Sequence, residues 1–369
     1  MRDRFLSFAG VSAIGLVLLC DSPGLSGQSP TPQKPMAGGI PRTPDGKPDL
    51  QGTYDLATIT PLERAAGTPL VLSPEQAAKL EQAVAKRNAQ GDAPVAADRQ
   101  APPKGGDGSP GPYGNVGGYN NFWLDPGSRY TVIDGQPRAS LVIDPPDGRV
   151  PALTERARER NNARRVTFTS DQRANEDDPG FEGPDAYNDP EQRPLGERCL
   201  VGFGSTSGPP ILPTYFYNNL HQIVQTPQSI MILTEMVHDA RIVRMNDAHL
   251  PSSIRKWLGD SVGHWEGDTL VVDTTNFTDE TRFRGSSENL LVVERFTRID
   301  ARTLRYQFTI DDPTTWAKPW TAEYAWPMTN ERIYEYACQE GNYALGNILR
   351  GARLKEKEEA EAKKTKSPR

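Results

Sequence analysis

The stretch VGHWEGDTLVVDTTNF, residues 262–277, decides the fold because it contains a complete β-hairpin. Gly267-Asp268 supplies the turn, and a β-branched run follows in which alternate side chains differ in polarity. Such a run is typical of a strand with two different faces. One face carries Leu270, Val272 and Thr274, and the other carries Thr269, Val271 and Asp273. The first face is the more apolar, so we predict that it points into the protein.

Nine segments after residue 220 share this character, at spacings of roughly 8 to 15 residues. No helical crossover separates them, and successive strands without crossovers pair antiparallel. So many strands curl into a sandwich or close into a barrel, which leaves no exposed edge. We predict a mainly β fold, an antiparallel meander barrel of lipocalin-like type, with a sandwich as the alternative. The predicted strands are His221–Gln225, Ser229–Met236, Arg241–Met245, Ser261–Trp265, Thr269–Asn276, Glu288–Asp300, Leu304–Asp311, Thr321–Ala325 and Arg332–Cys338.

The N-terminal half contains more loops. Asp49 to Tyr54 is a predicted first strand. Ser73-Pro74-Glu75 starts a helix, with serine as N-cap and proline at the first helical position, and this surface helix runs to about Gln90. The remaining predictions are short strands at 130–133 and 138–143 joined through Asp134-Gly135, a possible helix at 155–165, and long Pro/Gly-rich loops at 91–118 and 170–198.

The first residues predict export. Arg2 and Arg4 precede an apolar segment that is too short to span a bilayer, and small residues follow it. This pattern is typical of a secretory signal peptide, here residues 1–24. A lipoprotein acylated at Cys20 is the less favoured alternative, because Leu19 stands where a small residue is usual. We expect a periplasmic or secreted protein with no transmembrane segment in the mature chain.

The mature chain divides into three predicted parts. Residues 25–48 are a Pro-rich leader without apolar periodicity, expected to be disordered. Residues 49–353 form a single β-rich domain. Residues 354–369 are a charged tail that has no apolar face to pack, so we expect it to contribute nothing to the fold.

Two cysteines remain after the signal peptide, Cys199 and Cys338. In an oxidising compartment an isolated even pair predicts a disulfide, and two buried thiols are the alternative.

The net charge and the spacing of the histidines argue against two kinds of partner, nucleic acids and metal ions. The net charge of −6 provides no basic face, so no nucleic-acid partner is predicted. Metal sites usually show histidines at close spacing such as H-x-H, and no pair here has that spacing. We therefore predict no metal and no cofactor. The four histidines are His221, His238, His249 and His264.

Candidate catalytic groups lie at predicted strand ends. Glu235 and His238 stand between two strands, and Glu288 begins another, so His238 with the two carboxylates could exchange protons with a substrate. Polar residues at strand ends also commonly form turn hydrogen bonds and surface ion pairs. The loop GFGSTSG at 202–208 lacks the glycine spacing of a nucleophile elbow, so Ser205 and Ser207 are not predicted nucleophiles.

Aromatic residues are concentrated near the C-terminus. Trp320, Tyr324 and Trp326 share one face of an extended strand, and Tyr334 and Tyr336 share another. In a barrel such faces either line a ligand cavity or fill the interior.

Four segments of the chain are distinctive: DPPDGRVPALT at 144–154, WEGDTLVVDTTNF at 265–277, DDPTTWAKPW at 311–320 and CQEGNYALGNILRGAR at 338–353. These segments resemble a large family of exported bacterial proteins without an established activity. The resemblance covers most of the mature chain. Many members have CHEGNY where this chain has Gln339, so any chemical role of that histidine does not carry over.

Three functions are compatible with these patterns. The first is the binding of a small apolar or aromatic molecule in a barrel cavity, which the aromatic faces favour. The second is a hydrolase, lyase or isomerase that uses His238 with Glu235 and Glu288. The third is a structural envelope-associated protein without a ligand, which a filled barrel would favour.

Overall fold

The computed structural model describes residues 39–91, 125–164, 187–202, 208–214, 217–280, 283–286 and 288–366. The predicted signal peptide, Cys20, residues 25–38 of the leader, Ser205 and Ser207 lie outside these residues.

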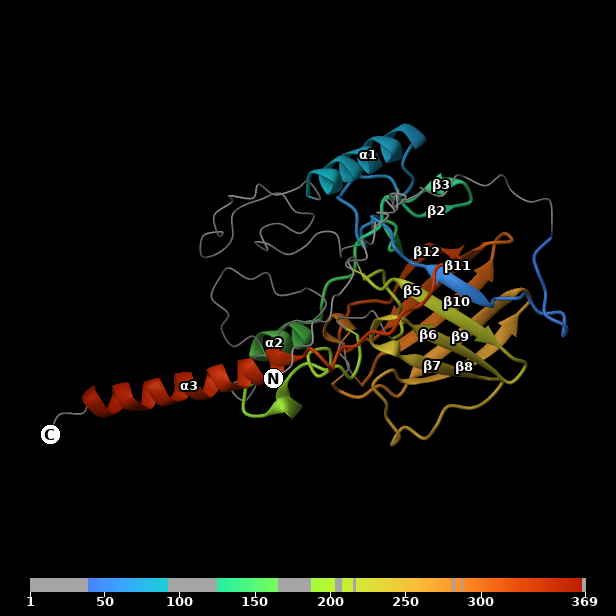
Figure 1. Cartoon of the computed structure of the whole chain (residues 1–369). Coiled ribbons are helices and arrows are strands. Elements are labelled where there is room, and N and C mark those ends of the chain that lie inside the picture. The colour runs from blue at the N-terminus through green and yellow to red at the C-terminus, as the bar shows by residue number, and fades with distance from the viewer. Residues whose placement is uncertain are drawn as a thin grey trace, which may run out of the picture. The chain divides into compact units, whose positions relative to one another are not determined.

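Nine strands form a closed barrel, so the predicted mainly β barrel is confirmed and the sandwich is not adopted (Figure 1). Neighbours follow in the order β1, β5 to β12, and the pairing of β1 with β12 closes the ring. The barrel strands are β1 (Gly52–Asp55), β5 (Leu220–Gln225), β6 (Ser229–Thr234), β7 (Ala240–Met245), β8 (Asp260–Glu266), β9 (Thr269–Thr275), β10 (Leu291–Arg298), β11 (Thr303–Asp311) and β12 (Trp320–Thr329).

One pair in the ring is parallel. Val243 of β7 pairs with Ser261 of β8, and Met245 pairs with Gly263. The prediction that all successive strands pair antiparallel is therefore wrong at this point. Strands that alternate in direction around a closed ring must be even in number, so a ring of nine requires one parallel pair. Residues 246–259, the crossover segment, run back from the end of β7 to the start of β8.

The hairpin β8–β9 has the predicted register. Leu270, Val272 and Thr274 are each no more than 1% exposed, and Thr269 and Asp273 on the other face are partly exposed. Val271 is also buried although it lies on the outer face. The inward orientation of the apolar face is confirmed.

The predicted strand Arg332–Cys338 is wrong. β12 extends to Thr329, and residues 330–338 form no strand. The remaining place in the ring is taken by β1, which the sequence predicts as the first strand and which pairs with β5 on one side and β12 on the other.

Smaller elements precede the barrel strands in the chain. α1 (Pro74–Gly91) begins as predicted: Gln76 N–H donates to Ser73 Oγ, and Ser73 N–H donates to Gln76 Oε1, which is a capping box. Its Ala77 packs against Leu72 and Ala139. The others are β2 (Val132–Ile133), β3 (Gln136–Pro137), β4 (Val142–Asp144, paired with β12), α2 (Glu155–Arg164) and the 3-10 turns η2 (Pro190–Gln192), η3 (Met236–His238) and η4 (Phe283–Gly285).

Large aromatic side chains fill the barrel. Trp326 lies 4.7 Å from Tyr306 and 5.5 Å from Phe296 between ring centroids, and each of these rings is 0% exposed. Two segments outside the strands complete this core. Leu50 enters it before β1, and Ile211 of segment 208–214 is held by a bond from its N–H to the Tyr306 hydroxyl at 2.9 Å.

Part of the predicted disordered leader is ordered. Arg42 donates to the Asp268 carboxylate in the β8–β9 turn, and the Gln225 side-chain amide donates to the Pro48 carbonyl. The prediction of disorder is therefore wrong for residues 39–48, because ion pairs and backbone bonds hold a segment that has no apolar periodicity.

A disulfide joins Cys199 to Cys338, as predicted. α3 (Tyr343–Lys366) follows, so the predicted boundary between domain and tail at 353/354 falls inside one helix. From Arg353 to Lys364 every α3 residue is exposed. None of the described helices is long and apolar enough to cross a bilayer.

Candidate functional site

A buried ion pair lies inside the barrel. Arg241 of β7 donates two hydrogen bonds to Glu294 of β10, at 2.5 and 2.9 Å, and both side chains are almost inaccessible to solvent. The Tyr306 hydroxyl also donates to Glu294, at 2.8 Å. Burial, and then the charge of Glu294, raise the pKa of Tyr306 well above 10, so this hydroxyl remains a donor.

This interior network has a structural role. The hydroxyl of Tyr306 accepts from the Ile211 N–H, and the hydroxyl of Tyr324 donates to the Ile211 carbonyl, at 2.9 Å each. A buried ion pair stabilises little once its desolvation is included, and the buried Arg241 Nε has no partner among the described residues, but the bonds to both Glu294 oxygens favour one arrangement. It therefore fixes segment 208–214 in the barrel.

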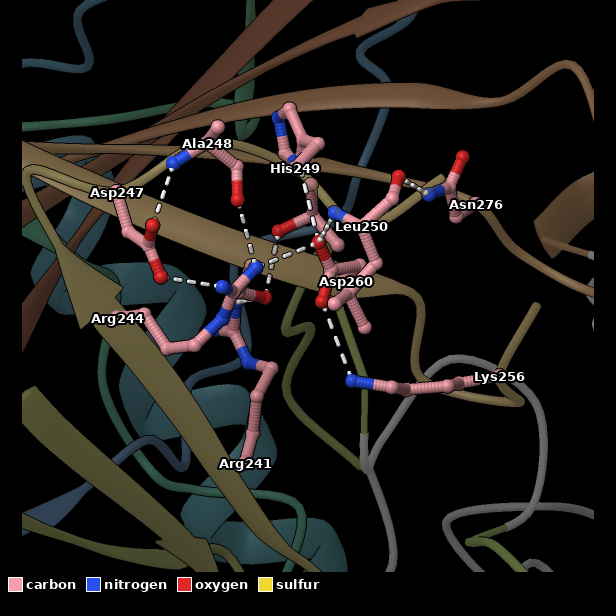
Figure 2. Close-up of polar contacts among 11 residues, drawn as sticks. Arg241, Arg244, Asp247, Ala248, His249, Leu250, Lys256, Asp260 and Asn276 are labelled. Atoms are coloured by element: carbon pink, nitrogen blue, oxygen red, sulfur yellow. Dashed lines mark hydrogen bonds and ion pairs between the residues drawn. The ribbon is translucent and has the colours of Figure 1, made fainter. Parts of the chain in front are cut away.

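A second cluster lies on the outer face of β7 and β8 (Figure 2). The Asp260 carboxylate, 1% exposed, accepts four hydrogen bonds: from Arg244 at 3.0 Å, Lys256 at 3.1 Å, the Leu250 N–H at 2.9 Å and, through its Nδ1, His249 at 3.2 Å. Three of these donors belong to the crossover segment. Asp260 therefore holds that segment on the barrel.

The electrostatics keep Asp260 ionised. Burial alone would raise the pKa of its carboxyl, but the bonds from Leu250, Lys256 and His249 and the charge of Arg244 outweigh it, so the pKa lies below its ordinary value. A buried carboxylate on imidazole Nδ1 also fixes the tautomer of His249, with the proton on Nδ1 and the lone pair on Nε2.

The third cluster is the rim turn, residues 235–239 between β6 and β7. The Glu235 carboxylate accepts from the Tyr334 N–H at 3.1 Å, and His238 Nδ1 accepts from the Tyr336 N–H at 3.0 Å. The chain after β12 therefore passes along the rim, where the Tyr336 ring lies nearly parallel to Tyr217 at 6.4 Å between centroids.

The rim turn has an uncommon backbone. Val237 has φ 62° and His238 has φ 53°. The left-handed region is a steric outlier for a β-branched residue and costs about 1–3 kcal/mol. Such strain persists only where surrounding contacts impose it, and here Glu235 and Asp239 are bonded to Leu220 and Thr234 of the flanking strands.

Asp55 lies close to the rim turn. It ends β1 and pairs with Leu220 of β5. Burial raises the pKa of its carboxyl to about 6; the Ala57 N–H lowers it, and the charges of Asp125, Glu331 and Glu235 raise it. A carboxyl group in this range can gain and lose a proton near neutral pH.

The structure brings some of the predicted site residues together. Glu235 and His238 lie in the rim turn and accept from the Tyr334 and Tyr336 N–H groups, so one predicted acid/base pair and two predicted ring residues lie together. Glu288 is not part of it: no described residue of the rim turn bonds to it, and its carboxylate faces Arg255 at 3.9 Å.

The other predicted ring residues fill the core. Trp320, Tyr324 and Trp326 are each 0% exposed, and each ring contacts other buried rings. Tyr334 is 69% exposed.

Sequence reasoning missed Asp55 and the pair His249–Asp260. Asp55 directly follows the predicted first strand, but its charged neighbours come from distant segments outside the strands. His249 precedes Asp260 by eleven positions in an irregular segment. No periodic pattern marks such a pair.

Comparisons with family models, curated proteins and solved structures give no match for this chain. Among the described residues, no group of three or more His, Cys, Asp or Glu side chains is arranged to hold a metal ion.

Proposed function

We propose that the protein binds a small aromatic molecule at the rim of its barrel, between the Tyr217–Tyr336 ring pair and the rim turn. One observation carries this proposal: two backbone hydrogen bonds place Tyr334 and Tyr336 beside Glu235 and His238. Partly exposed rings offer faces on which a planar ligand can stack, and the polar groups next to them can orient it.

The rim supports this proposal better than the interior does. The interior rings already contact one another, with Trp326 within 6.2 Å of Tyr54, Tyr324 and three other rings between centroids. A ligand there would have to displace core side chains, which costs several kcal/mol. At the rim, stacking requires no such displacement.

A second candidate function is proton transfer to or from the bound molecule, as in a hydrolase, lyase or isomerase. Asp55 favours it, because a carboxyl with a pKa of about 6 beside the rim turn can act as acid or base near neutrality. His238 would then orient the substrate through Nε2, since its Nδ1 is occupied by the Tyr336 N–H.

We further propose that the protein acts outside the cytoplasm. The Cys199–Cys338 disulfide is typical of oxidising compartments, and the first residues resemble a signal peptide.

Titration of the protein with indole and with phenol, followed by NMR, tests ring binding. We expect saturable binding that Tyr336→Ala weakens about tenfold, because loss of one stacking partner costs on the order of 1 kcal/mol or more. Tyr343→Ala is the matched control, since Tyr343 is an exposed tyrosine on α3 with no part in the rim. Binding that both variants leave intact would refute the proposal, and the absence of any binding would favour a ligand-free structural role.

A further inference from the structure

The pair His249–Asp260 has the geometry of an oriented general base. Asp260 is almost fully buried and stays ionised, and its Oδ2 lies 3.2 Å from His249 Nδ1. In hydrolases that use a serine, a histidine and an aspartate, a buried aspartate holds imidazole in the tautomer whose Nε2 can accept a proton, and then stabilises the imidazolium that forms. Asp260 is a buried aspartate that is bonded to the His249 imidazole in the same way.

The imidazole is also accessible. The His249 side chain is 30% exposed, and Figure 2 shows its second ring nitrogen pointing away from Asp260. No described residue forms a hydrogen bond with that Nε2. The nitrogen that would accept a proton therefore lies on the side of a partly exposed ring away from Asp260, and the other nitrogen faces the buried carboxylate.

Neighbouring contacts hold the ring in place. Leu250 donates its N–H to Asp260, and its carbonyl accepts from the buried Asn276 side chain at 2.8 Å (Figure 2). Both the N–H and the carbonyl of Leu250, the residue after His249, are thus hydrogen-bonded. Such support from a surrounding shell is what a general base requires and what an exposed loop histidine usually lacks.

We propose that His249, oriented by Asp260, is a general base that takes a proton from a small substrate bearing an activated C–H or O–H group. The bond from that hydrogen to carbon or oxygen breaks, a bond to Nε2 forms, and the imidazolium faces the carboxylate. The charged groups around the pair are Arg244 and Lys256 on Asp260, and Asp247 on Arg244. The site is separate from the rim, so the proposal does not rest on ring binding there.

The structure offers a matched control. His264 Nε2 lies 3.3 Å from Glu266, almost the same distance, but that carboxylate is 50% exposed and also binds Arg295. An imidazole beside a solvated carboxylate gains little orientation. His264→Gln therefore removes an accessible histidine without removing an oriented base.

The test uses the elimination of 5-nitrobenzisoxazole as a probe of general bases. The base takes the proton from C3, the N–O bond breaks, and a cyanophenolate is released while the proton passes from Nε2 to water. We expect the full protein to accelerate this reaction over buffer, and His249→Gln to lower the protein-dependent rate about a hundredfold, at the low end for a positioned base. His264→Gln should leave the rate unchanged.

Arg255→Met separates the base from a structural role, because it removes bonds from the crossover segment to the Phe277 and Glu288 carbonyls and leaves His249 and Asp260 intact. If His249 only holds the crossover segment in place, Arg255→Met and His249→Gln should lower the rate alike, whereas a base predicts a lower rate in His249→Gln only. Equal rates in all variants, or equal losses at His249 and His264, would overturn the proposal.

If His249→Gln does not fold, chemical modification of the histidines in the wild-type protein tests the proposal instead. Diethyl pyrocarbonate acylates unprotonated imidazole nitrogen, and mass spectrometry identifies the site. Faster modification of His249 than of His264 supports the proposal, and equal or slower modification overturns it.

Discussion

The raised pKa of the Asp55 carboxyl depends on the folded structure, so it could not be predicted from the residues next to Asp55 in the sequence. Its carboxyl is partly buried at the end of β1, and the charges that raise its pKa are negative. Burial and like charges both disfavour ionisation, so the folded protein holds this proton up to about pH 6, whereas the unfolded chain releases it near pH 4.

The raised pKa of Asp55 makes the stability of the protein depend on pH. Between about pH 4 and pH 6 the folded state binds more protons than the unfolded state, so Asp55 lowers the free energy of unfolding as pH rises through this window. Asp55→Asn keeps an acceptor for the Ala57 N–H and removes the charge. We expect it to stabilise the protein at pH 7 by up to about 3 kcal/mol and to have no effect near pH 4. Urea denaturation at both pH values measures this, and equal stability of the two proteins at pH 7 would show that Asp55 is solvated.

At the scale of elements, sequence periodicity predicted the strands, strand faces and helix cap that depend only on residues close together in the sequence. The faces of β9, the N-cap of α1 and eight of the barrel strands follow from side-chain alternation and capping chemistry. The strand predicted at 332–338 failed because alternating tyrosines there serve the rim, through backbone bonds to Glu235 and His238, and not a sheet. The parallel pair β7–β8 was missed because it follows from the closure of nine strands, which no single segment encodes.

The register of β9 provides a test at this scale. Val272→Asp places a carboxylate in the core, where Val272 pairs with Gly263 and Glu294 and is 0% exposed. We expect a loss of at least about 3 kcal/mol and little soluble protein.

Thr269→Asp is the control on the outer face of the same strand. Its hydroxyl bonds Thr297 and its neighbour is Glu266, so we expect a cost of about 1 kcal/mol or less. Soluble expression and thermal denaturation distinguish the two variants. Equal behaviour would mean that this strand does not face the core as the structure shows.

At the scale of the whole molecule, the chain outside the strands holds the barrel together at widely separated points. Arg42 and Leu50 contact the barrel from the N-terminal side, Ile211 enters its core, and Asp260 fixes the crossover segment. The candidate sites lie where these irregular segments meet the strands. Their residues come together only in the closed fold, so the sequence indicated Glu235 and His238 as a pair but not their contacts with the Tyr334 and Tyr336 backbone.

The C-terminal region is tied to the rest of the protein by the Cys199–Cys338 disulfide and a few exposed hydrogen bonds. Gln339 and Asn342 donate to the carbonyls of Arg198 and Glu197, and Arg353 donates to those of Tyr187 and Asn188. Gln339 thus has a structural partner in the Arg198 carbonyl. Exposed hydrogen bonds each contribute only about 1 kcal/mol, so the disulfide is the principal tether.

The crosslink closes a loop of 139 residues that contains eight strands of the barrel. On the chain-entropy model this lowers the entropy of the unfolded chain enough to stabilise the fold by about 5 kcal/mol, and loss of native disulfides typically costs 2–5 kcal/mol. We expect the double variant Cys199→Ser, Cys338→Ser to lose stability in that range in urea, while its circular dichroism in water still shows the barrel. Hydrogen exchange should rise in the first half of α3 before it rises in β9 or β10, because no α3 residue from Tyr343 to Lys364 is buried. Unchanged stability with fast exchange confined to α3 would mean that the bond tethers the helix without constraining the barrel.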